Sequence, residues 1–303
     1  MEQLMSINYD YYRIFYYVAK YKSFTQAASA LVNSQPNITR AIKNLEQELG
    51  CTLFTRTSRQ VRLTPEGEAL YRHVSVAFEQ LQAGEEEIAK GKGLDGGVLR
   101  IAATEVALHT FLLPVLKQFR SQYPGVHIKL MNDSTPAAIS DLESGLADLA
   151  VVTTPAEITK SLRSLPLTNV QEVAVCGSAY TTLTHSPISL AELLEYPIIS
   201  LVEQSGTYRF YSQLFADHRL IFEPDIEAAT ADQILPMVKA NLGIGFVPSA
   251  FLQDEDMETS VFTIPLTEQI PLREVCLLLS TTHPLSPAAR ELKESLLRAR
   301  EEK

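Results

Sequence analysis

Apolar residues in the first 50 positions recur three and four residues apart, the spacing of a helix that is buried on one side. Residues 9–20 predict a first helix, and a short second helix is expected to begin with Thr25 as its N-cap. A third helix is predicted between Ser34, its N-cap, and Gly50, its C-terminal stop. Only Val32-Asn33 separates the second helix from the third, which is the length of a helix-turn-helix turn.

The predicted third helix has two chemically different faces. One face carries Ile38, Ile42, Leu45 and Leu49, and the opposite face carries Pro36, Arg40, Lys43 and Gln47. A cationic, polar face backed by an apolar stripe favours a helix that lies in a DNA major groove.

Two short strands follow this helix and are joined by a turn at Thr57-Ser58-Arg59. They predict a β-wing that carries Arg56, Arg59 and Arg62. A solvated run of surface charge is the alternative interpretation. Because the wing directly follows a helix-turn-helix, contact with phosphates or the minor groove is favoured.

A long helix is predicted to open at Thr64-Pro65, with the threonine as N-cap. Within it, apolar or small residues alternate at intervals of four and three: Leu70, Val74, Ala77, Leu81, Gly84 and Ile88. This heptad seam favours pairing with the same helix of a second copy, and packing on its own chain is the alternative. The glycine-rich stretch Gly91–Gly97 predicts the main domain boundary.

From Val98 onward, short apolar strands alternate with helices. Strands are expected at 98–103, 126–131, 149–152, 170–175, 198–201, 245–247 and 275–279, and helices at 111–123, 136–144, 190–194, 208–215, 232–241 and 288–298. This order predicts a parallel sheet covered by helices and a second α/β lobe, with the last strand and helix returning to the first sheet. Ligands in such folds bind in a cleft at strand carboxyl ends and helix N-termini.

The charge of the chain is unevenly distributed. The net charge of −10, taken alone, argues against nucleic acid. Residues 1–65, however, hold eight basic residues against four acidic ones, so they carry +4 and the remaining residues carry −14. A basic N-terminal segment can neutralise phosphates, while the acidic remainder repels them.

Three further features of the sequence concern membrane segments, cysteines and histidines. The chain shows no apolar run long enough to span a membrane and no signal-peptide pattern, so a cytoplasmic protein is expected. Its three cysteines, Cys51, Cys176 and Cys276, have neither disulfide nor zinc spacing and are interpreted as buried, unreactive thiols. The histidines show no metal-ligand spacing, although His109 is one helical turn from Glu105, so no metal, cofactor or catalytic residue is predicted.

These motifs together resemble the LysR family of transcriptional regulators over essentially the whole chain. The resemblance rests on Ser23–Leu31, Ser34-Gln-Pro36, Leu45–Gly50, Leu53-Phe54, Arg56 and Leu63–Gly67, with weaker matches at Leu112–Pro114, Gly145–Ala150 and Gly243–Pro248. Asn37 and Thr39 depart from the residues usual in the reading helix of the family, which affects the choice of operator. Asn37 offers either a bidentate contact to adenine or a phosphate contact.

The resemblance implies an α/β fold with an N-terminal all-α winged helix-turn-helix at 1–64, a long dimerising linker helix at 65–92, and an effector-binding regulatory domain at 93–303. That domain is expected to resemble a type-2 periplasmic binding protein, with lobe I at about 93–165 and 267–303 and lobe II at about 166–266. The implied assembly is a homotetramer, built as a dimer of dimers. Its implied partners are double-stranded promoter DNA, a small-molecule co-inducer and RNA polymerase.

Two sets of site residues are carried by the resemblance and the patterns above. The DNA-binding set is Ser23, Thr25, Ser34, Gln35, Pro36, Asn37, Thr39, Arg40, Lys43, Arg56, Thr57 and Arg59. The effector-binding set is Ala103, Thr104, Glu105, Thr153, Thr154, Val202, Glu203, Gln204, Ser205, Gly206, Thr207, Thr230 and Phe246, with Ala231 beside Thr230.

The chemistry of the effector is left open by the sequence. Ser205-Gly206-Thr207 offers backbone N–H groups that suit an anion, although capping the next helix is the alternative role. Glu105 and Glu203 disfavour a multiply charged anion unless Arg209 turns inward, so an amine-bearing or neutral effector stays possible. A second hypothesis is a receptor or enzyme whose N-terminal part only oligomerises, and the basic balance of residues 1–65 favours DNA binding over it.

Overall fold

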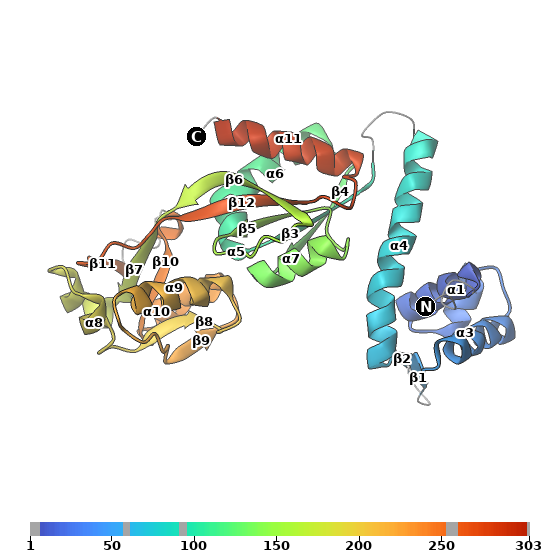
Figure 1. Cartoon of the computed structure of the whole chain (residues 1–303), viewed down its shortest axis with the longest axis horizontal. Helices are drawn as coiled ribbons and strands as arrows, with labels where there is room; N and C mark the ends of the chain where they lie inside the picture. The colour runs from blue at the N-terminus through green and yellow to red at the C-terminus, as the bar shows by residue number, and fades with distance from the viewer. Residues whose placement is uncertain (1–6, 57–60, 91–95, 253–259, 302–303) are drawn as a thin grey trace. The chain divides into compact units, whose positions relative to one another are not determined.

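The computed structural model describes residues 7–56, 61–90, 96–252 and 260–301. The chain forms two compact units, residues 1–93 and 94–303, called here the N-terminal unit and the C-terminal unit (Figure 1). The expected wing turn at Thr57–Arg59 lies outside the described residues, as does most of the expected boundary at Gly91–Gly97.

The N-terminal unit is a three-helix cluster followed by a two-stranded wing and a long helix. Its elements are α1 (Tyr9–Tyr21), α2 (Phe24–Ala30), α3 (Gln35–Leu49), β1 (Phe54–Arg56), β2 (Val61–Leu63) and α4 (Pro65–Lys90). The apolar stripe of α3 is buried as predicted, since Ile38, Ile42 and Leu45 are fully inaccessible and pack with Phe15 of α1. Gly50 ends α3 in the left-handed region, at φ +69.

The start of α2 corrects one expectation. Its N-cap is Ser23, whose hydroxyl accepts a hydrogen bond from the backbone N–H of Gln26 at 3.2 Å, and not Thr25. The helix begins earlier because Phe24 is buried in the core and belongs to the first turn. Thr25 is therefore an exposed residue inside the helix.

The first part of α4 packs on its own unit. Tyr16 of α1 stacks on Phe78 with 4.9 Å between ring centroids and on Tyr71 with 6.1 Å, so the tyrosines of α1 brace the long helix. Val74 belongs to the same core and is 8% exposed, which makes intramolecular packing the right interpretation for that part of the seam. Leu81 is 52% exposed, and the side chain of Ile88 lies outside the described set.

Lobe I of the C-terminal unit contains a five-stranded sheet in the order β4-β3-β5-β12-β6. Its elements are β3 (Val98–Ala103), α5 (Glu105–Ala107), the π-helical turn η2 (Leu108–Leu112), α6 (Leu113–Gln122), β4 (His127–Asn132), α7 (Thr135–Glu143), β5 (Leu149–Thr153), β6 (Leu162–Val170), β12 (Arg273–Ser280) and α11 (Pro287–Glu301). Strands β4, β3 and β5 are parallel, as predicted, while β12 runs antiparallel to β5 and β6.

Lobe II contains a second five-stranded sheet, in the order β11-β7-β10-β8-β9. Its elements are β7 (Glu172–Gly177), the 3₁₀ segment η3 (Ser178–Thr184), α8 (Leu190–Leu193), β8 (Ile198–Leu201), α9 (Gly206–Asp217), β9 (Ile226–Ala228), η4 (Ala231–Gln233), α10 (Ile234–Lys239), β10 (Ile244–Pro248), η5 (Ser249–Leu252) and β11 (Val261–Ile264). The two lobes are joined by Gln171, between β6 and β7, and by the segment 265–272.

Three strands were not predicted, and one predicted strand is divided. The expected strand 170–175 breaks at Gln171 between β6 and β7, so the expected lobe boundary near 165 falls inside β6. β6 contains Pro166 and many polar residues, which a strand at the edge of a sheet tolerates. β9 and β11 are short edge strands, too brief to give a clear apolar period.

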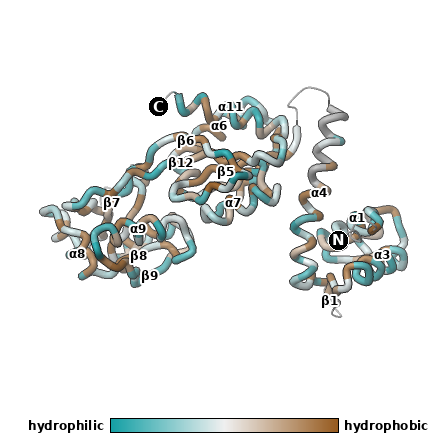
Figure 2. Tube along the Cα trace, viewed as in Figure 1, coloured by the Kyte–Doolittle hydropathy of each residue, from teal (hydrophilic) through white to brown (hydrophobic). Residues whose placement is uncertain are grey.

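Helices cover both faces of each sheet, so each lobe has a core on either side. In lobe I, Leu99 and Ile101 pack with α6 and α11, while Ala102 and Ala150 pack with α7. The segment labelled β5 is accordingly hydrophobic in Figure 2. Cys176 and Cys276 are buried in these cores, as expected, and burial raises the pKa of the Cys176 thiol to about 11. Cys51 is half-buried.

Candidate functional site

The polar face of α3 is open to solvent. Ser34 caps the helix by accepting a hydrogen bond from the backbone N–H of Asn37 at 3.4 Å. Arg40, Lys43 and Gln47 are exposed along the face opposite the buried stripe. A cationic surface on one helix is therefore available to a duplex, with the core behind it fixing the orientation of the helix.

The first turn of α3 carries an ordered set of amide side chains. Asn37 donates from its side-chain amide to Asn33 Oδ1 at 3.0 Å, and Gln35 donates to the hydroxyl of Thr39 at 3.3 Å. Asn33 Oδ1 also accepts from the backbone N–H of Ser34 at 2.8 Å. Asn37 must therefore release Asn33 before its amide can make a bidentate contact to a base.

The wing is tied to α3 by Glu46, a contact that no sequence pattern predicted. Glu46 Oε1 accepts hydrogen bonds from the backbone N–H groups of Leu53 at 2.8 Å and Phe54 at 3.3 Å, so it joins the end of α3 to the start of β1. β1 pairs antiparallel with β2, with Arg56 opposite Val61. Of the three expected wing arginines, Arg62 is exposed, and the side chains of the other two lie outside the described set.

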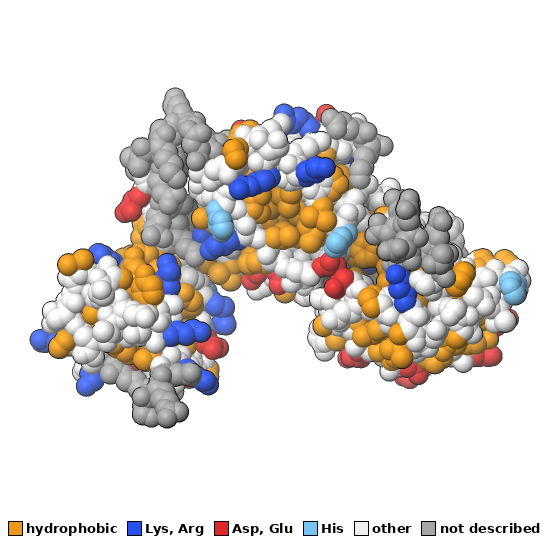
Figure 3. Space-filling view, turned by 180° about the vertical axis from the view of Figure 1, so that it is seen from behind, with side chains coloured by type: hydrophobic (Ala, Val, Ile, Leu, Met, Phe, Trp, Pro, Cys, Tyr) orange, Lys and Arg blue, Asp and Glu red, His pale blue; other side chains and the backbone are white. Residues whose placement is uncertain are grey.

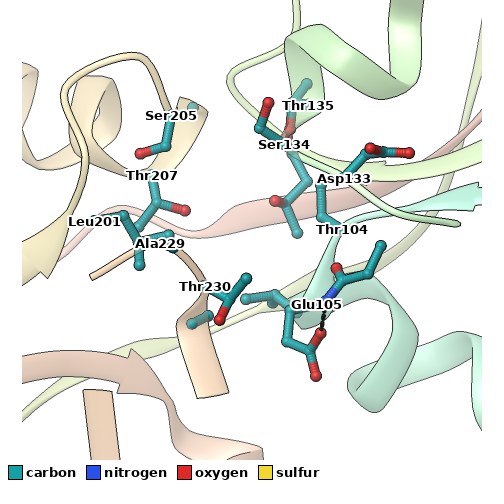
Figure 4. Close-up of a pocket in the computed structure, with 15 residues that line it drawn as sticks. Thr104, Glu105, Asp133, Ser134, Thr135, Leu201, Ser205, Thr207, Ala229 and Thr230 are labelled. Atoms are coloured by element: carbon teal, nitrogen blue, oxygen red, sulfur yellow. Dashed lines mark hydrogen bonds between the residues drawn. The ribbon is translucent and has the colours of Figure 1, made fainter. Parts of the chain in front are cut away.

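A cavity of ≈ 160 Å³, called here the effector cleft, lies between the two lobes of the C-terminal unit (Figure 4). From the predicted effector-binding set it brings together Thr104, Glu105, Thr153, Ser205, Gly206, Thr207 and Thr230. Ala231, predicted beside Thr230, also lines it. The remaining lining residues were not predicted from the sequence: Val106, Asn132, Asp133, Ser134, Thr135, Leu201 and Ala229.

Three helix N-termini meet at the effector cleft. Thr104 caps α5, Ser134 caps α7 and Ser205 caps α9, each by accepting a hydrogen bond from a backbone N–H three residues on, at 3.4, 3.4 and 3.0 Å. The first N–H groups of a helix carry partial positive charge, so this end of the cleft favours an anionic or hydrogen-bond-accepting group. Figure 4 shows Ser205 and Thr207 facing Ser134 and Thr135 across the cavity.

Two carboxylates, Glu105 and Asp133, line the effector cleft. Glu105 accepts from the side-chain amide of Asn132, drawn as a dashed line in Figure 4, and its other oxygen lies 2.7 Å from His109 Nε2. Asp133 points away from Ser205 and Thr207 in Figure 4, and burial raises the pKa of its carboxyl. Glu105 is therefore already paired, whereas Asp133 Oδ2 is buried and has no hydrogen-bond partner among the described residues.

Six predicted effector residues lie elsewhere. Ala103 is buried in the lobe I core, and Thr154 accepts from the backbone N–H of Glu274 at 2.9 Å. Val202, Glu203 and Gln204 lie between β8 and α9 outside the cleft lining, and Phe246 lines a neighbouring cavity. Arg209 does not turn inward either, because it pairs with Glu157 at 2.6 Å.

A buried ion pair lies where the chain passes between the lobes. Arg273, the first residue of β12, donates to Glu172, the first residue of β7, at 2.8 Å, and both side chains are 1% exposed. The same guanidinium donates to the carbonyl of Thr154 at 2.7 Å and to the hydroxyl of Thr153 at 2.9 Å. Arg273 therefore joins the ends of three strands from both sheets beneath the cleft.

The described residues also bear on two other features, a metal site and a membrane-spanning helix. Within the described ranges, no group of three or more His, Cys, Asp or Glu side chains is placed to hold a metal ion. None of the helices in the described part of the chain is both long and apolar enough to cross a membrane.

Family models match both units. The model of the bacterial regulatory helix-turn-helix protein, lysR family, matches residues 9–68, and the model of the LysR substrate binding domain matches residues 92–301. The chain therefore belongs to the LysR family and is a DNA-binding transcriptional regulator with an effector-binding domain.

Individual relatives agree with this membership. The chain is 30% identical to the HTH-type transcriptional regulator CysB of Burkholderia cenocepacia, over 77% of this chain and 75% of that protein. It is 29% identical to the uncharacterised HTH-type transcriptional regulator YnfL of Escherichia coli, over 97% of this chain and 99% of the relative. Among solved structures, full-length CbnR complexed with its target DNA is similar in fold, with a TM-score of 0.71 and 17% identity over 96% of this chain and 99% of that one.

Proposed function

We propose that this regulator binds promoter DNA through α3 and the wing, and that a small molecule in the effector cleft controls the binding. The observation that carries the proposal is the exposed cationic face of α3, with Arg40 and Lys43, in a chain whose overall charge is −10. A fold relative, CbnR, is known in complex with its target DNA.

In the proposed complex, the N-terminal half of α3 reads bases. Arg40 and Lys43 are the residues with the reach and charge for guanine edges or phosphates, while Asn37 reaches bases after leaving Asn33. Ser23, Thr25, Ser34, Gln35, Pro36 and Thr39 complete the proposed contact set on this side. Arg56, Thr57 and Arg59 are proposed for backbone or minor-groove contact from the wing.

The proposed effector is small and presents an acidic group to the helix N-termini of the effector cleft. The cavity of ≈ 160 Å³ is about the volume that accommodates a benzene ring in a protein interior. Lining residues come from both lobes, so a ligand that contacts both favours a closed arrangement. Closure is proposed to alter how DNA-binding units are presented within the assembly.

The proposed assembly is a homotetramer, a dimer of dimers, in which α4 of residues 65–92 pairs with its twin. The exposed Leu81 supports pairing through the second half of α4. In lobe I, Leu113 and Leu130 are 43% and 38% exposed on α6 and on the edge strand β4, and Figure 3 shows an apolar area on this lobe. An exposed apolar edge of this kind supports a second contact between copies. RNA polymerase is proposed as a further partner on the family resemblance alone.

DNA binding by α3 can be tested with a double substitution, Arg40→Ala plus Lys43→Ala. Duplexes selected by the wild-type protein from a random pool serve as probes in fluorescence anisotropy. We expect affinity to fall by on the order of a hundredfold, because each base or phosphate contact is worth about 1–3 kcal/mol. The salt dependence of binding should also become shallower.

The matched control is Lys239→Ala plus Arg290→Ala, which removes two exposed cations from the C-terminal unit. It should leave DNA affinity within about twofold of wild type, since it changes the net charge equally without touching α3. Equal binding by both double variants would show that α3 is not the reading helix.

A further inference from the structure

A second, smaller cavity adjoins the effector cleft. We call it the inner chamber, and its characteristic lining residues are Glu172, Ser200, Tyr211, Phe246 and Arg273. The chamber and the cleft share the lining residues Val106, Leu201, Thr207 and Ala231, so the two cavities are direct neighbours. The volume of the inner chamber is ≈ 10 Å³, which is room for about one water-sized group.

Three polar atoms at the inner chamber have no hydrogen-bond partner in the described part of the chain. They are Glu172 Oε2, Ser200 Oγ and Tyr211 Oη, on residues that are 1%, 3% and 2% exposed. A buried polar atom without a partner loses its hydrogen bonds to water and gains none in return, so folded proteins rarely contain one. Three such atoms on one small cavity indicate a place that receives a polar group.

The three atoms are held by different elements, which fixes their mutual arrangement. Glu172 begins β7, Ser200 lies in β8, and Tyr211 lies in α9, where its ring stacks on Phe246 with 4.6 Å between centroids. Burial, and next the negative charge of Glu172, raise the pKa of Tyr211 well above its usual 10. The phenol therefore stays protonated and can donate, and a side-chain interaction with Glu172 contributes to the same rise in its pKa.

The charge balance of the chamber selects the kind of group. Glu172 is already neutralised by Arg273 through its other oxygen. An ammonium would bring an uncompensated positive charge and a carboxylate an uncompensated negative charge into this buried site, and taking either ion out of water is costly. A hydroxyl avoids both costs, because it donates to Glu172 Oε2 and accepts from Ser200 or Tyr211.

We propose that the inner chamber is a subsite for a hydroxyl group of the effector, whose acidic group lies at the helix N-termini of the cleft. The effector class is then a small hydroxylated carboxylic acid. This inference rests on the proposed function, which places an effector in the cleft. A hydroxyl bound to Glu172 would also be connected to the segments that join the two lobes. Glu172 accepts a hydrogen bond from Arg273, and Arg273 in turn donates to Thr153 and Thr154.

The class can be tested with four-carbon acids, whose size suits the cleft. Isothermal titration calorimetry of the full chain would compare butyrate with 2-, 3- and 4-hydroxybutyrate and with the corresponding aminobutyrates. We expect at least one hydroxybutyrate to bind about five- to tenfold more tightly than butyrate, the effect of one added hydrogen bond.

Ser200→Ala and Tyr211→Phe then locate the hydroxyl. Each removes a hydroxyl that has no partner in the described structure, so the melting temperature without ligand should be equal to or higher than that of wild type. At least one of them should abolish the advantage of the hydroxybutyrate and leave butyrate affinity unchanged. Tyr180→Phe, in lobe II outside both cavities, is the matched control and should retain the advantage.

Several outcomes overturn the inference. Equal affinity for butyrate and every hydroxybutyrate, or an advantage that survives both variants, would remove the hydroxyl subsite. An aminobutyrate preference lost in these variants would assign the chamber to an ammonium instead. Absence of binding by all the acids would reject the acid class.

Gly206→Val separates failure of the chamber from failure of the cleft. A Cβ at Gly206 lies 3.3 Å from the carbonyl oxygen of Pro155 and 3.4 Å from Thr135 Oγ1, so a valine crowds the cleft between the lobes. If butyrate binding is lost in this variant without a hydroxyl advantage in wild type, the cleft assignment stands and the chamber falls. If butyrate binding is unaffected, the cleft assignment itself fails.

Discussion

The two functional surfaces of this chain are built in opposite ways. In the N-terminal unit, Arg40 and Lys43 project from one continuous helix over a core that holds it in place. In the C-terminal unit, the effector cleft is assembled from residues between 104 and 231, at the ends of strands and the starts of three helices. The first surface depends on one helical period, and the second depends on the topology of two sheets.

Because of this difference, the two surfaces contribute differently to the stability of the fold. The exposed cations of α3 contribute little to folding, since solvent already satisfies them. The polar groups of the cleft also cap helices, and the pair beneath them holds strands of both sheets. Substitutions of the exposed cations of α3 should therefore change binding alone, while substitutions under the cleft should change binding and stability together.

The largest effect is expected for Arg273→Met. The change leaves Glu172 buried without its partner, and breaking one side of a buried ion pair costs about 3–5 kcal/mol. Because the chain has no tryptophan, unfolding in urea is best followed by circular dichroism. The double variant Arg273→Met plus Glu172→Met should recover part of the loss, since it removes the unpaired charge.

Arg163→Met is the control for this prediction, because Arg163 is exposed on the edge strand β6. Its cost should stay within about 0.5 kcal/mol. If Arg273→Met were no more destabilising than Arg163→Met, the cleft would not be supported from beneath, and the contrast with α3 would disappear.

A smaller effect is expected in the N-terminal unit for Gly67→Ala. A Cβ at this position would lie 2.2 Å from the carbonyl oxygen of Leu53, a backbone atom, so the start of α4 must move away from β1. We expect a loss of about 2–3 kcal/mol, the upper part of the usual range for overpacking, seen as a lower melting temperature.

Gly84→Ala provides the matched comparison on the same helix. A Cβ there meets nothing within 4 Å, so alanine should stabilise α4 by about 0.5–1 kcal/mol. The two variants should shift the melting temperature in opposite directions. Shifts of the same sign would mean that the close approach of Gly67 to the carbonyl oxygen of Leu53 does not limit the stability of the N-terminal unit.

The smallest of these effects is expected for Glu46→Ala. It removes the acceptor that joins α3 to β1, at a cost of about 1 kcal/mol in the free energy of unfolding. DNA affinity should fall as well, because the wing loses its fixed position relative to α3. Glu46→Gln keeps an acceptor oxygen and should retain most of the affinity in the anisotropy assay. Unaltered affinity in Glu46→Ala would show that the wing does not need this link.

Sequence patterns were sufficient for the elements that carry a regular period. The stripe Ile38, Ile42 and Leu45 is buried as predicted, and β3 and β8 have the predicted bounds. The same patterns misplaced the cap of α2, because Ser23 and Thr25 are both good N-caps and only the burial of Phe24 decides between them. They also missed edge strands such as β6, where one side of the ladder is free and polar residues are tolerated.

Only some of the residues that line the effector cleft carry a local signal in the sequence. Ser205–Thr207 carry a visible capping signal, and they line the cavity. Ser134 followed by Thr135 and Pro136 carries the same capping signal at the start of α7, so the sequence holds enough information to predict this part of the cleft as well. The burial of Glu172 against Arg273 has no local signal, since 101 positions separate the two residues.

Burial of the pair under the cleft has a consequence for how the two activities respond to their medium. Dissolved ions screen charges that solvent can reach, and the Glu172 and Arg273 side chains are 1% exposed. Raising the ionic strength should therefore release the duplex while leaving the integrity of the lobes almost untouched. Salt concentration can therefore change DNA binding by the N-terminal unit without unfolding the C-terminal unit.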